Sequence, residues 1–371
     1  MNTDPKTIFF AGGGTGGHLF PGIAVAQALV TRDASLKPVF LCTERELDRT
    51  ILDPTGFERI TQPIVPPARS IGGLLKFWRA WRETKDLVKS LLRDRKPAVV
   101  LGLGGYAAGV AVKLAGGRNV PTAILNPDVI PGKANRYLMQ SSRIICCQFE
   151  QTAEHVSVSY RDRLRVTGCP IRADLASLPT REEAAKRLGL DPRGLNLVVT
   201  GASQGALTVN EAVLEALKSI KLQGWQIIHL TGKDHADSVR QEYRELDRVA
   251  RVIDFTEQMR DIWAVADLCI SRSGASTCAE LTAAAVPSIL MPYPFHADMH
   301  QRANARVLAD AGCAELLDDK KDRRRNAELL KPVLEKLLYD ATARSDMSQR
   351  ARALAKPDAA ERVAEELLGM L

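Results

Sequence analysis

The sequence lacks the signatures of several protein classes. Its seven cysteines are scattered and include no C-x-x-C pair, so neither a disulfide framework nor a zinc site is expected. No stretch is apolar enough to span a bilayer. Two common metal-binding patterns, H-E-x-x-H and Asp-x-Asp, are also missing. We therefore expect no bound metal and no cofactor.

The amino-terminal segment does not have the pattern of a secretory signal. Residues 7–31 carry no charge, but glycines and Pro21 interrupt the apolar run, and no basic segment precedes it. Together with the unpaired cysteines, this predicts a cytosolic protein.

Composition narrows the class further. A chain of 371 residues is about twice the common domain size, so two domains are expected. A hydrophobic fraction of 45% and a charged fraction of 26% exclude a disordered chain. The formal net charge of +7 suits an anionic partner, meaning nucleotide phosphates, nucleic acid or an acidic lipid surface, and charge alone does not choose among them. The motifs of the chain favour a nucleotide and a lipid, so we expect no nucleic-acid partner.

Short apolar runs alternate with amphipathic ones, which predicts an α/β fold of βα units around parallel sheets. The pattern restarts after a turn-rich connection near residues 168–179, and each half begins with a small-residue turn between a strand and a helix. Two doubly wound domains facing each other across a cleft would explain the restart. The expected strands are 7–11, 39–43, 98–101, 122–125, 144–147 and 164–167, followed by 195–200, 226–230, 251–255, 268–271 and 288–291; helices are expected at 21–30, 74–93 and 329–371, the last with a break near Pro357.

The first turn, 12–18, satisfies the dinucleotide pattern G-x-G-x-x-G. An NAD enzyme is a weak alternative, because the acid expected after the second strand, Glu44, comes late. His18 at the mouth of the turn suits a proton acceptor, and otherwise it caps or packs against the helix.

Two further segments carry polar residues at helix starts. In 271–280, Ser276 and Thr277 can face a phosphate, and Glu280 can accept hydrogen bonds from a ribose diol or merely complement the helix dipole. In 292–304, Asp298, Gln301 and Asn304 share one helix face and could bind sugar hydroxyls. His296 and His300 form a conceivable metal pair, which no wider pattern supports.

Residues 74–82 combine apolar and basic side chains in a chain with only 5% aromatic residues. This composition suits an interfacial helix on an anionic membrane, although an ordinary core-facing helix explains it equally well. The residues expected at the membrane are Leu74, Leu75, Lys76, Phe77, Trp78, Arg79, Trp81 and Arg82.

Taken together, the motifs resemble the MurG family of N-acetylglucosaminyltransferases. The matching segments are 11–22, 102–106, 131–136, 201–206, 273–280 and 298–304, in the family's order along nearly the whole chain. The resemblance implies a GT-B architecture with Rossmann-like domains at 1–169 and 170–356, and a C-terminal helix at 357–371 that packs back on the first. It also implies a peripheral location on the cytoplasmic face of the cell membrane.

The implied reaction is an inverting, metal-independent transfer of N-acetylglucosamine (GlcNAc) from UDP-GlcNAc to the 4-hydroxyl of N-acetylmuramic acid (MurNAc) in undecaprenyl-pyrophosphoryl-MurNAc-pentapeptide. His18 is the implied general base, and Asp128 is a second catalytic and substrate-binding candidate. The implied donor-site residues are Thr15, Gly16, Gly17, Arg172, Ser203, Thr256, Ala275, Ser276, Thr277, Cys278, Ala279, Glu280 and Gln301.

Two departures from the family pattern stand out. Residues 125–128 read Leu-Asn-Pro-Asp where the family usually has His-Glu-Gln-Asn, and Cys169 replaces the usual Asn before Pro170. Because the first change falls on the acceptor side, two alternatives stay open: a related glycosyltransferase with another lipid acceptor, and a catalytically silent UDP-sugar-binding membrane protein.

Overall fold

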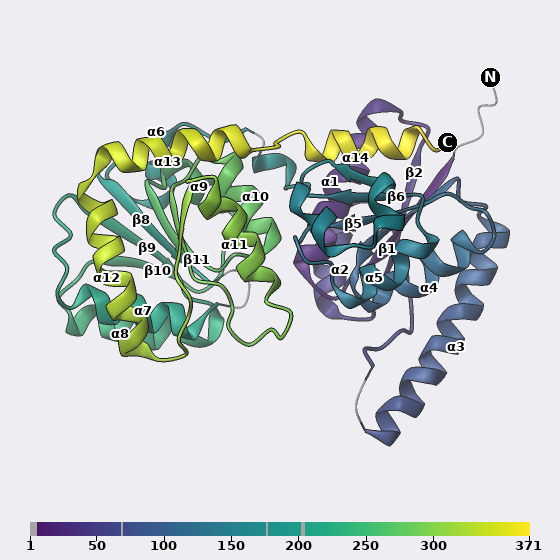
Figure 1. The fold of residues 1–371 in the computed structure, drawn as a ribbon, viewed down its shortest axis with the longest axis horizontal. Coiled ribbons are helices and arrows are strands. Elements are labelled where there is room, and N and C mark those ends of the chain that lie inside the picture. Colours follow the sequence, from purple (N-terminus) through teal and green to yellow (C-terminus); the bar gives the residue numbers. More distant parts are fainter. Residues whose placement is uncertain (1–5, 68–69, 176, 202–204) are drawn as a thin grey trace. The chain divides into compact units, whose positions relative to one another are not determined.

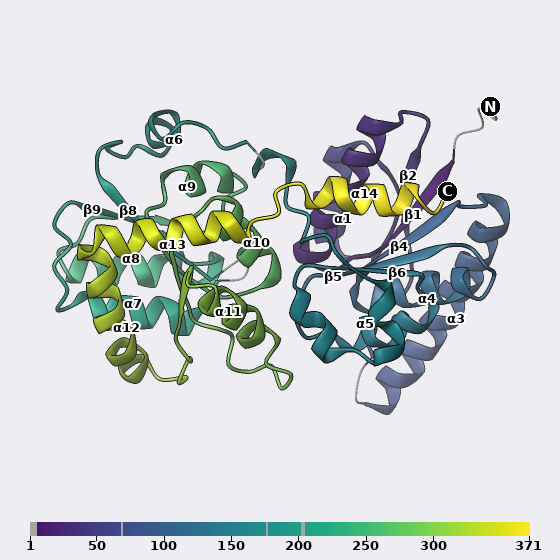
Figure 2. The same cartoon turned by 45° about the horizontal axis from the view of Figure 1, so that its top comes forward.

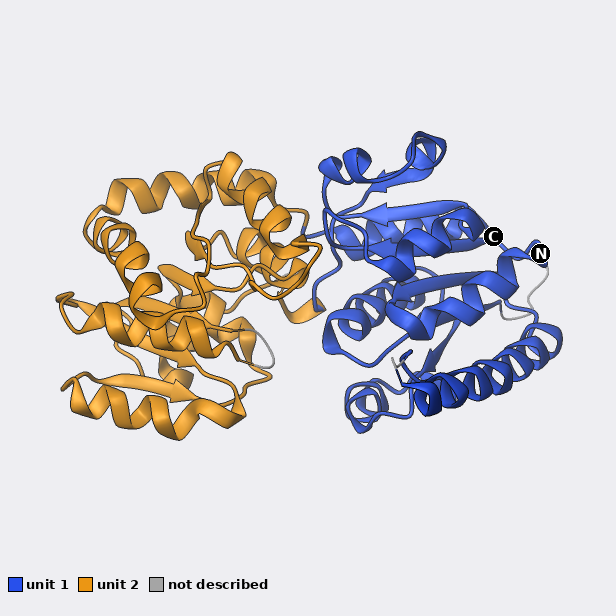
Figure 3. Ribbon diagram, turned by 60° about the horizontal axis from the view of Figure 1, so that its bottom comes forward, with its two compact units in different colours: residues 1–172, 357–371 blue, residues 173–356 orange. Residues whose placement is uncertain are grey.

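The computed structural model describes residues 6–67, 70–175, 177–201 and 205–371. The chain divides into two compact units, shown in different colours in Figure 3. Unit 1 comprises Met1–Arg172 and Pro357–Leu371, and unit 2 comprises Ala173–Lys356. The first division therefore falls after Arg172, three positions beyond the expected boundary at 169.

Unit 1 is built on a parallel sheet. Its strands are β1 (Thr7–Gly12), β2 (Lys37–Cys42), β3 (Glu58–Thr61), β4 (Val99–Gly104), β5 (Thr122–Asn126), β6 (Ile144–Cys147) and β7 (Leu164–Val166), in the order β3-β2-β1-β4-β5-β6-β7. Its helices are α1 (Gly16–Arg32), α2 (Glu46–Leu52), α3 (Ile71–Asp94), α4 (Gly105–Gly116), α5 (Lys133–Leu138) and α14 (Ala359–Leu368).

Both faces of this sheet are covered. In β1, Ile8 and Phe10 pack with α1 and α14, whereas Phe9 and Ala11 pack with α3 and α4. A parallel sheet buried on both sides needs apolar residues on both sides, which explains the unbroken apolar run of this strand. Helix α14 lies beside α1 (Figure 2), and an ion pair of 2.7 Å joins Arg32 to Glu365.

Unit 2 repeats this plan. Its strands are β8 (Leu195–Thr200), β9 (Trp225–Leu230), β10 (Ala250–Ile253), β11 (Leu268–Ser271), β12 (Ser288–Leu290) and β13 (Ala314–Leu316), in the order β10-β9-β8-β11-β12-β13. Strands β8 to β11 are labelled in Figure 1. Its helices are α6 (Arg181–Leu188), α7 (Leu207–Leu217), α8 (Ala236–Glu245), α9 (Met259–Val265), α10 (Ala275–Ala283), α11 (His300–Asp310), α12 (Arg323–Tyr339) and α13 (Ala341–Leu354). Helices α7, α8 and α12 pack on one face of the sheet.

Each expected strand overlaps an observed one, but two strands were missed. They are β3 and β13, and each lies at one edge of its sheet, opposite the edge strands β7 and β10 that were expected. An edge strand is less enclosed than a central one, so it does not require a long apolar run. Helix α1 begins at Gly16, earlier than expected, and contains Pro21. The helical tail has a second break at Asp340, whose side chain accepts a hydrogen bond from the Ala343 amide at 2.8 Å.

Candidate active site

The glycine turn of unit 1 connects β1 to α1. Gly14 adopts a φ of +83°, in the left-handed region that favours glycine. At Gly13 a side chain has no room, because a Cβ atom there would lie 2.2 Å from Oδ2 of Asp48. Because neither residue has a side chain, the backbone of the turn can approach the carboxylate of Asp48 closely. The following residues Thr15 and Gly17 are exposed, so this part of the loop is accessible to a ligand.

His18 is held in the first turn of α1. Its Nδ1 lies 3.2 Å from the carbonyl oxygen of Gly13 and 3.2 Å from the hydroxyl of Thr15. The ring also packs closely on backbone, since a Cβ atom at Gly105 would lie 3.0 Å from its Cε1. Gly13 lies outside α1, so its carbonyl orients the His18 ring toward the glycine turn. A histidine that only capped the helix would not require this contact.

The protonation of His18 suits a base. Burial lowers its pKa below the ordinary value of 6.5, while the hydrogen bond to Gly13 and the negative charges of Asp128 and Asp48 act in the opposite direction. At neutral pH the ring is therefore mainly in the neutral form, which can accept a proton.

Asp128 follows β5 in the same half-site, where its charge acts on His18. The turn that carries it is pinned, because Asn126 Nδ2 donates to the carbonyl of Asp128 at 2.8 Å. Asn135 of α5 in turn donates from Nδ2 to Asn126 Oδ1 at 3.1 Å. The departure from the family pattern thus places a carboxylate near enough to the candidate base for its charge to act on the imidazole.

Arg172 also belongs to this half-site. Its guanidinium lies over the ring of Phe20, 5.5 Å from the ring centre, and Phe20 is on α1 beside the glycine turn. The structure therefore brings Arg172 to the turn that carries Gly16 and Gly17.

In unit 2, the start of α10 forms a candidate phosphate site. The first i to i+4 hydrogen bond of α10 runs from the amide of Cys278 to the carbonyl of Gly274, at 2.9 Å. The amides of Ser276 and Thr277 come before it, at the start of the helix. Both residues are partly exposed, and a helix start favours an anion. Cys278 is fully buried and Ala279 nearly so. Their side chains pack in the interior, so a ligand at this helix start would meet their backbone, and their place in the donor site stays a prediction.

Glu280 is oriented by a tryptophan. Trp263, on α9 and almost completely buried, donates from Nε1 to Oε2 of Glu280 at 2.9 Å. A buried donor that holds one carboxylate oxygen restricts the orientation of the Glu280 side chain more than an interaction with the helix dipole would. A fixed carboxylate at this point suits recognition of hydroxyl groups.

The start of α11 is joined to the segment before α10. Ser273 Oγ donates to the carbonyl of Gln301 at 2.8 Å, and Gln301 Oε1 accepts from the amide of Tyr293 at 2.9 Å. Asn304 is fully buried and donates to the carbonyl of Ser273 at 3.1 Å. Asn304 is therefore a structural residue and not the sugar ligand that its helical spacing predicted, whereas Gln301 is partly exposed.

A buried ion pair lies behind this half-site. Arg272 Nη1 lies 2.8 Å from Asp319 Oδ2 and also donates to the carbonyls of Met291 and Pro292. The other oxygen of Asp319, Oδ1, accepts a hydrogen bond from the side-chain Nδ2 of Asn326 at 2.8 Å. This network joins the ends of β11 and β12 to the segment before α12.

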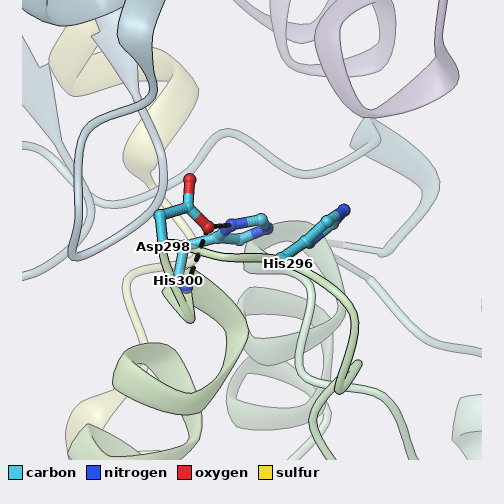
Figure 4. A group of neighbouring side chains, drawn as sticks. All are labelled: His296, Asp298 and His300. Atoms are coloured by element: carbon cyan, nitrogen blue, oxygen red, sulfur yellow. Dashed lines mark hydrogen bonds and ion pairs between the residues drawn. The ribbon is translucent and has the colours of Figure 1, made fainter.

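A largely exposed group is formed by His296 and Asp298, on the segment before α11, and by His300, the first residue of that helix (Figure 4). Asp298 Oδ1 and His300 Nδ1 are 2.7 Å apart, and the two imidazole rings stack with centres 4.5 Å apart. One donor atom from each residue lies within 4.8 Å of the others, so the group could hold a divalent cation. Burial raises the pKa of Asp298, but the hydrogen bond and charge of His300 bring that pKa below its ordinary value. The hydrogen bond between Asp298 and His300 thus holds these two side chains together.

The last two donor-site candidates are Thr256 and Ser203. Thr256 follows β10, and its hydroxyl accepts from the amide of Gln258 at 3.0 Å, beside the half-exposed ring of Phe255. Ser203 lies outside the described residues.

The amino-terminal half of α3 presents an apolar strip, which we define as Ile71, Leu74, Leu75 and Trp78. Their spacing of three and four residues places them on one side of the helix, and Leu75 and Trp78 are 68% and 63% exposed. Arg79 and Arg82 follow Leu75 by four and seven residues, so they extend the same side by one and two turns. Figure 1 shows this part of α3 extending away from the sheet of unit 1.

Not all the aromatic residues expected at a membrane belong to this strip. Phe77 and Trp81 are partly buried and pack on the core of unit 1. A Cβ atom at Gly109 of α4 would lie 3.7 Å from the Trp81 ring. One side of the helix therefore packs on the core, as in a core-facing helix, and another side is exposed; its contact with a membrane stays a prediction. None of the helices in the described ranges has the length and apolar character needed to cross a membrane.

Comparison with known sequences decides the family. Residues 8–144 match the glycosyltransferase family 28 N-terminal domain, and residues 196–363 match the C-terminal domain of the same family. A relative from Thermodesulfovibrio yellowstonii is 35% identical over 96% of this chain and 97% of its own length. A relative from Anaeromyxobacter dehalogenans is 36% identical over 96% of this chain and 91% of its own. Both are named UDP-N-acetylglucosamine–N-acetylmuramyl-(pentapeptide) pyrophosphoryl-undecaprenol N-acetylglucosamine transferase.

The chain belongs to the MurG family of glycosyltransferases.

Solved structures agree with this fold. The MurG of Acinetobacter baumannii covers 98% of this chain with a TM-score of 0.75 at 24% identity. A UDP-GlcNAc 2-epimerase from Neisseria meningitidis, solved with UDP-GlcNAc, covers 98% with a TM-score of 0.68 at 13% identity. The two α/β units with parallel sheets are thus those of the GT-B class expected from the MurG resemblance.

Reasoning from the sequence missed two residues that organise the MurG-type motifs. Asp48 contacts the glycine turn from α2, and Trp263 holds Glu280 from α9. For Asp48 the sequence did hold a signal, because the pattern of the glycine turn predicts an acid after the second strand. The acid considered there was Glu44, which precedes α2, and not Asp48, which lies within α2. For Trp263 the sequence offers no signal, since the contact depends on how α9 and α10 pack.

Proposed function

We propose that this chain transfers GlcNAc from UDP-GlcNAc to the MurNAc 4-hydroxyl of undecaprenyl-pyrophosphoryl-MurNAc-pentapeptide, with inversion and release of UDP. The observation that carries the proposal is the near full-length similarity to relatives named for this transfer. Retention of the glycine turn and of the Glu280 helix supports it.

In the proposed step, the acceptor oxygen forms a bond to the anomeric carbon of GlcNAc while the bond from that carbon to the UDP diphosphate breaks. The acceptor proton passes to Nε2 of His18. This atom has the available lone pair, because a carbonyl oxygen can only accept and Nδ1 therefore donates to Gly13. The electron pair of the broken bond leaves with the diphosphate.

The charge on the leaving diphosphate needs stabilisation from fixed donors. We assign this to the start of α10, where the amides of Ser276 and Thr277 and the helix dipole favour an anion. By the resemblance to the MurG family, Arg172 is also assigned to the charge of the diphosphate. Glu280 is assigned to the ribose hydroxyls, and Gln301 to the sugar. None of these assignments requires a metal ion.

The acceptor is a polyprenyl lipid, so the enzyme must work at a bilayer surface. We assign membrane contact to the α3 strip, with Arg79, Arg82 and Lys76 beside anionic headgroups on the cytoplasmic face. Each basic contact near the surface is worth about 1 kcal/mol and weakens with salt.

A related transferase with another lipid acceptor is the second candidate, and Asp128 is the observation that favours it. A carboxylate replaces the family's usual neutral Asn on the acceptor side, so a different acceptor head is chemically reasonable.

A single assay separates these functions from a catalytically silent UDP-sugar-binding protein. The purified chain is incubated with UDP-GlcNAc and undecaprenyl-pyrophosphoryl-MurNAc-pentapeptide in detergent micelles, and UDP release and glycolipid product are followed. Release that depends on this acceptor supports the proposal. Release only with a different lipid-linked sugar favours the second candidate, and UDP-GlcNAc binding without turnover identifies the silent protein.

A further inference from the structure

Asp48 is a fully buried carboxylate that contacts two loops. It lies on α2 with 0% of its surface exposed. Oδ1 accepts a hydrogen bond of 2.7 Å from the amide of Gly14. Oδ2 accepts from the amide of Thr43 at 2.8 Å and from its hydroxyl at 2.7 Å. A buried charge is costly unless such donors compensate it, so this residue has a specific reason to be there.

These contacts hold the peptide groups next to His18. On one side of Gly14 the amide donates to Asp48, and on the other side its carbonyl accepts from Arg45 Nη1 at 2.9 Å. The preceding residue, Gly13, lies against the carboxylate so closely that no side chain fits. The position of the Gly13 carbonyl therefore depends on Asp48.

The Gly13 carbonyl in turn sets the state of the imidazole. It accepts from Nδ1 of His18 at 3.2 Å, which favours the tautomer with the proton on Nδ1 and the lone pair on Nε2. If the carbonyl moved, both the ring direction and the tautomer would lose their support.

We propose that Asp48 is a positioning residue for catalysis, acting through Gly14 and the Gly13 carbonyl on the orientation and tautomer of His18. This inference rests on the proposed role of His18 as the base. It also excludes a role for Asp48 as a ribose ligand, because a carboxylate with no exposed surface cannot reach a nucleotide. The negative charge of Asp48 also acts on His18 directly. It raises the pKa of the imidazole, whereas burial lowers that pKa.

The test is a double-mutant cycle on kcat with Asp48→Asn, His18→Ala and the double variant. Asp48→Asn keeps the shape but replaces one oxygen with an NH₂ group that faces donors. We expect it to lower kcat by about 10-fold to 10²-fold, with KM for UDP-GlcNAc within about twofold of the parent. In the His18→Ala background the same change should have no further effect on kcat. An equal loss of kcat in both backgrounds would overturn the proposal, because Asp48 would then act independently of His18.

A second readout reports on the imidazole itself. In protein labelled with ¹⁵N-histidine, the His18 resonances, assigned by their loss in His18→Ala, should show Nδ1–H in the parent and a mixture of tautomers in Asp48→Asn. An unchanged tautomer would count against the proposal. This measurement needs no activity, so it still tests Asp48 if His18→Ala retains full kcat and the base assignment fails.

Two variants guard against a simple loss of folding. Arg45→Gln removes the other contact to Gly14 from an exposed side chain, and it should lower kcat a few-fold only when His18 is present. Asp261→Asn is the matched control, because Asp261 is a buried carboxylate in unit 2 paired with Arg187 at 2.6 Å. It should reduce stability without changing the tautomer of His18. If Asp261→Asn changed the tautomer as Asp48→Asn does, the proposed link would be refuted.

Discussion

Trp263 donates its indole N–H to Oε2 of Glu280 at 2.9 Å, from a helix different from the one that carries the glutamate. The indole is almost completely buried, so its position is fixed by the packing of α9. A carboxylate held in this way has less conformational freedom to lose when a ligand binds.

We predict that Glu280→Ala weakens the binding of UDP-GlcNAc and leaves the fold intact. The loss should be roughly 2 kcal/mol, as for a hydrogen bond to a charged group. Titration calorimetry with UDP measures it directly. Unchanged affinity for UDP would reduce Glu280 to a residue that complements the helix dipole.

Trp263→Phe is the matched control for this prediction. It keeps the ring in the core and the charge of Glu280 but removes the donor, so it should cause a smaller loss of UDP affinity than Glu280→Ala. A larger loss than that of Glu280→Ala would mean that Trp263 acts on the donor site by another route.

The second prediction concerns the α3 strip. Replacing Leu75 and Trp78 together with serine should reduce co-sedimentation with vesicles that contain anionic lipid, because both side chains are mostly exposed. Added salt should weaken the binding of the parent chain through Arg79 and Arg82. Val158→Ser, at a 74% exposed site elsewhere in unit 1, is the control and should bind as the parent does. Equal binding by the double variant would assign the membrane contact to another surface.

The central strands were predictable because both of their faces are buried. A strand that is buried on both faces favours apolar residues at consecutive positions, and residues 8–11 of β1 and 197–199 of β8 show this in the sequence itself. The edge strand β3 contains Glu58 and Arg59 and could not be recognised in the same way. Its position at the edge is not the whole reason, because the edge strands β7 and β10 were expected from their own apolar residues.

The candidate site was predictable only in part. Glycine turns and helix starts are local, so Gly14, His18 and Glu280 could be placed from their neighbours in the sequence. Contacts between elements could not, and Asp48 on Gly14 is an example at a separation of 34 residues. Helical spacing was misleading for Asn304, because a shared helix face does not say whether that face is covered.

The third prediction concerns the buried ion pair of unit 2. Asp319→Ala leaves the Arg272 guanidinium buried without its partner, so the free energy of unfolding should fall by about 3–5 kcal/mol. Urea unfolding at pH 7 measures this. Asp237→Ala, which breaks the exposed pair with Arg240, is the control and should have little effect. Equal stability of Asp319→Ala and the parent would show that the network contributes nothing.

The same pair predicts a pH dependence. Burial raises the pKa of Asp319, but hydrogen bonds, first from Thr208 and then from Asn326, the Lys321 amide and Arg272, bring that pKa below its ordinary value. A carboxyl with a depressed pKa stabilises the fold above its unfolded pKa of about 3.9 and loses this contribution as the pH falls through the folded value. The parent should therefore lose more stability than Asp319→Ala between neutral pH and pH values below about 4. Parallel pH curves for the two chains would contradict the assignment.

The last prediction joins His18 to Asp128. If His18 is the base, His18→Ala should lower kcat by about 10²-fold or more, while binding of UDP-GlcNAc changes little. A base works in its neutral form, so kcat of the parent should fall as the pH drops through the pKa of His18. Burial places that pKa below 6.5, and the charge of Asp128 acts to raise it. Asp128→Asn removes this charge, so the acidic limb of the pH–rate profile should move to lower pH, with kcat at pH 7 within a few-fold of the parent. Should His18→Ala instead keep full kcat with the same acidic limb, the base lies elsewhere, and Asp128 becomes the first residue to examine.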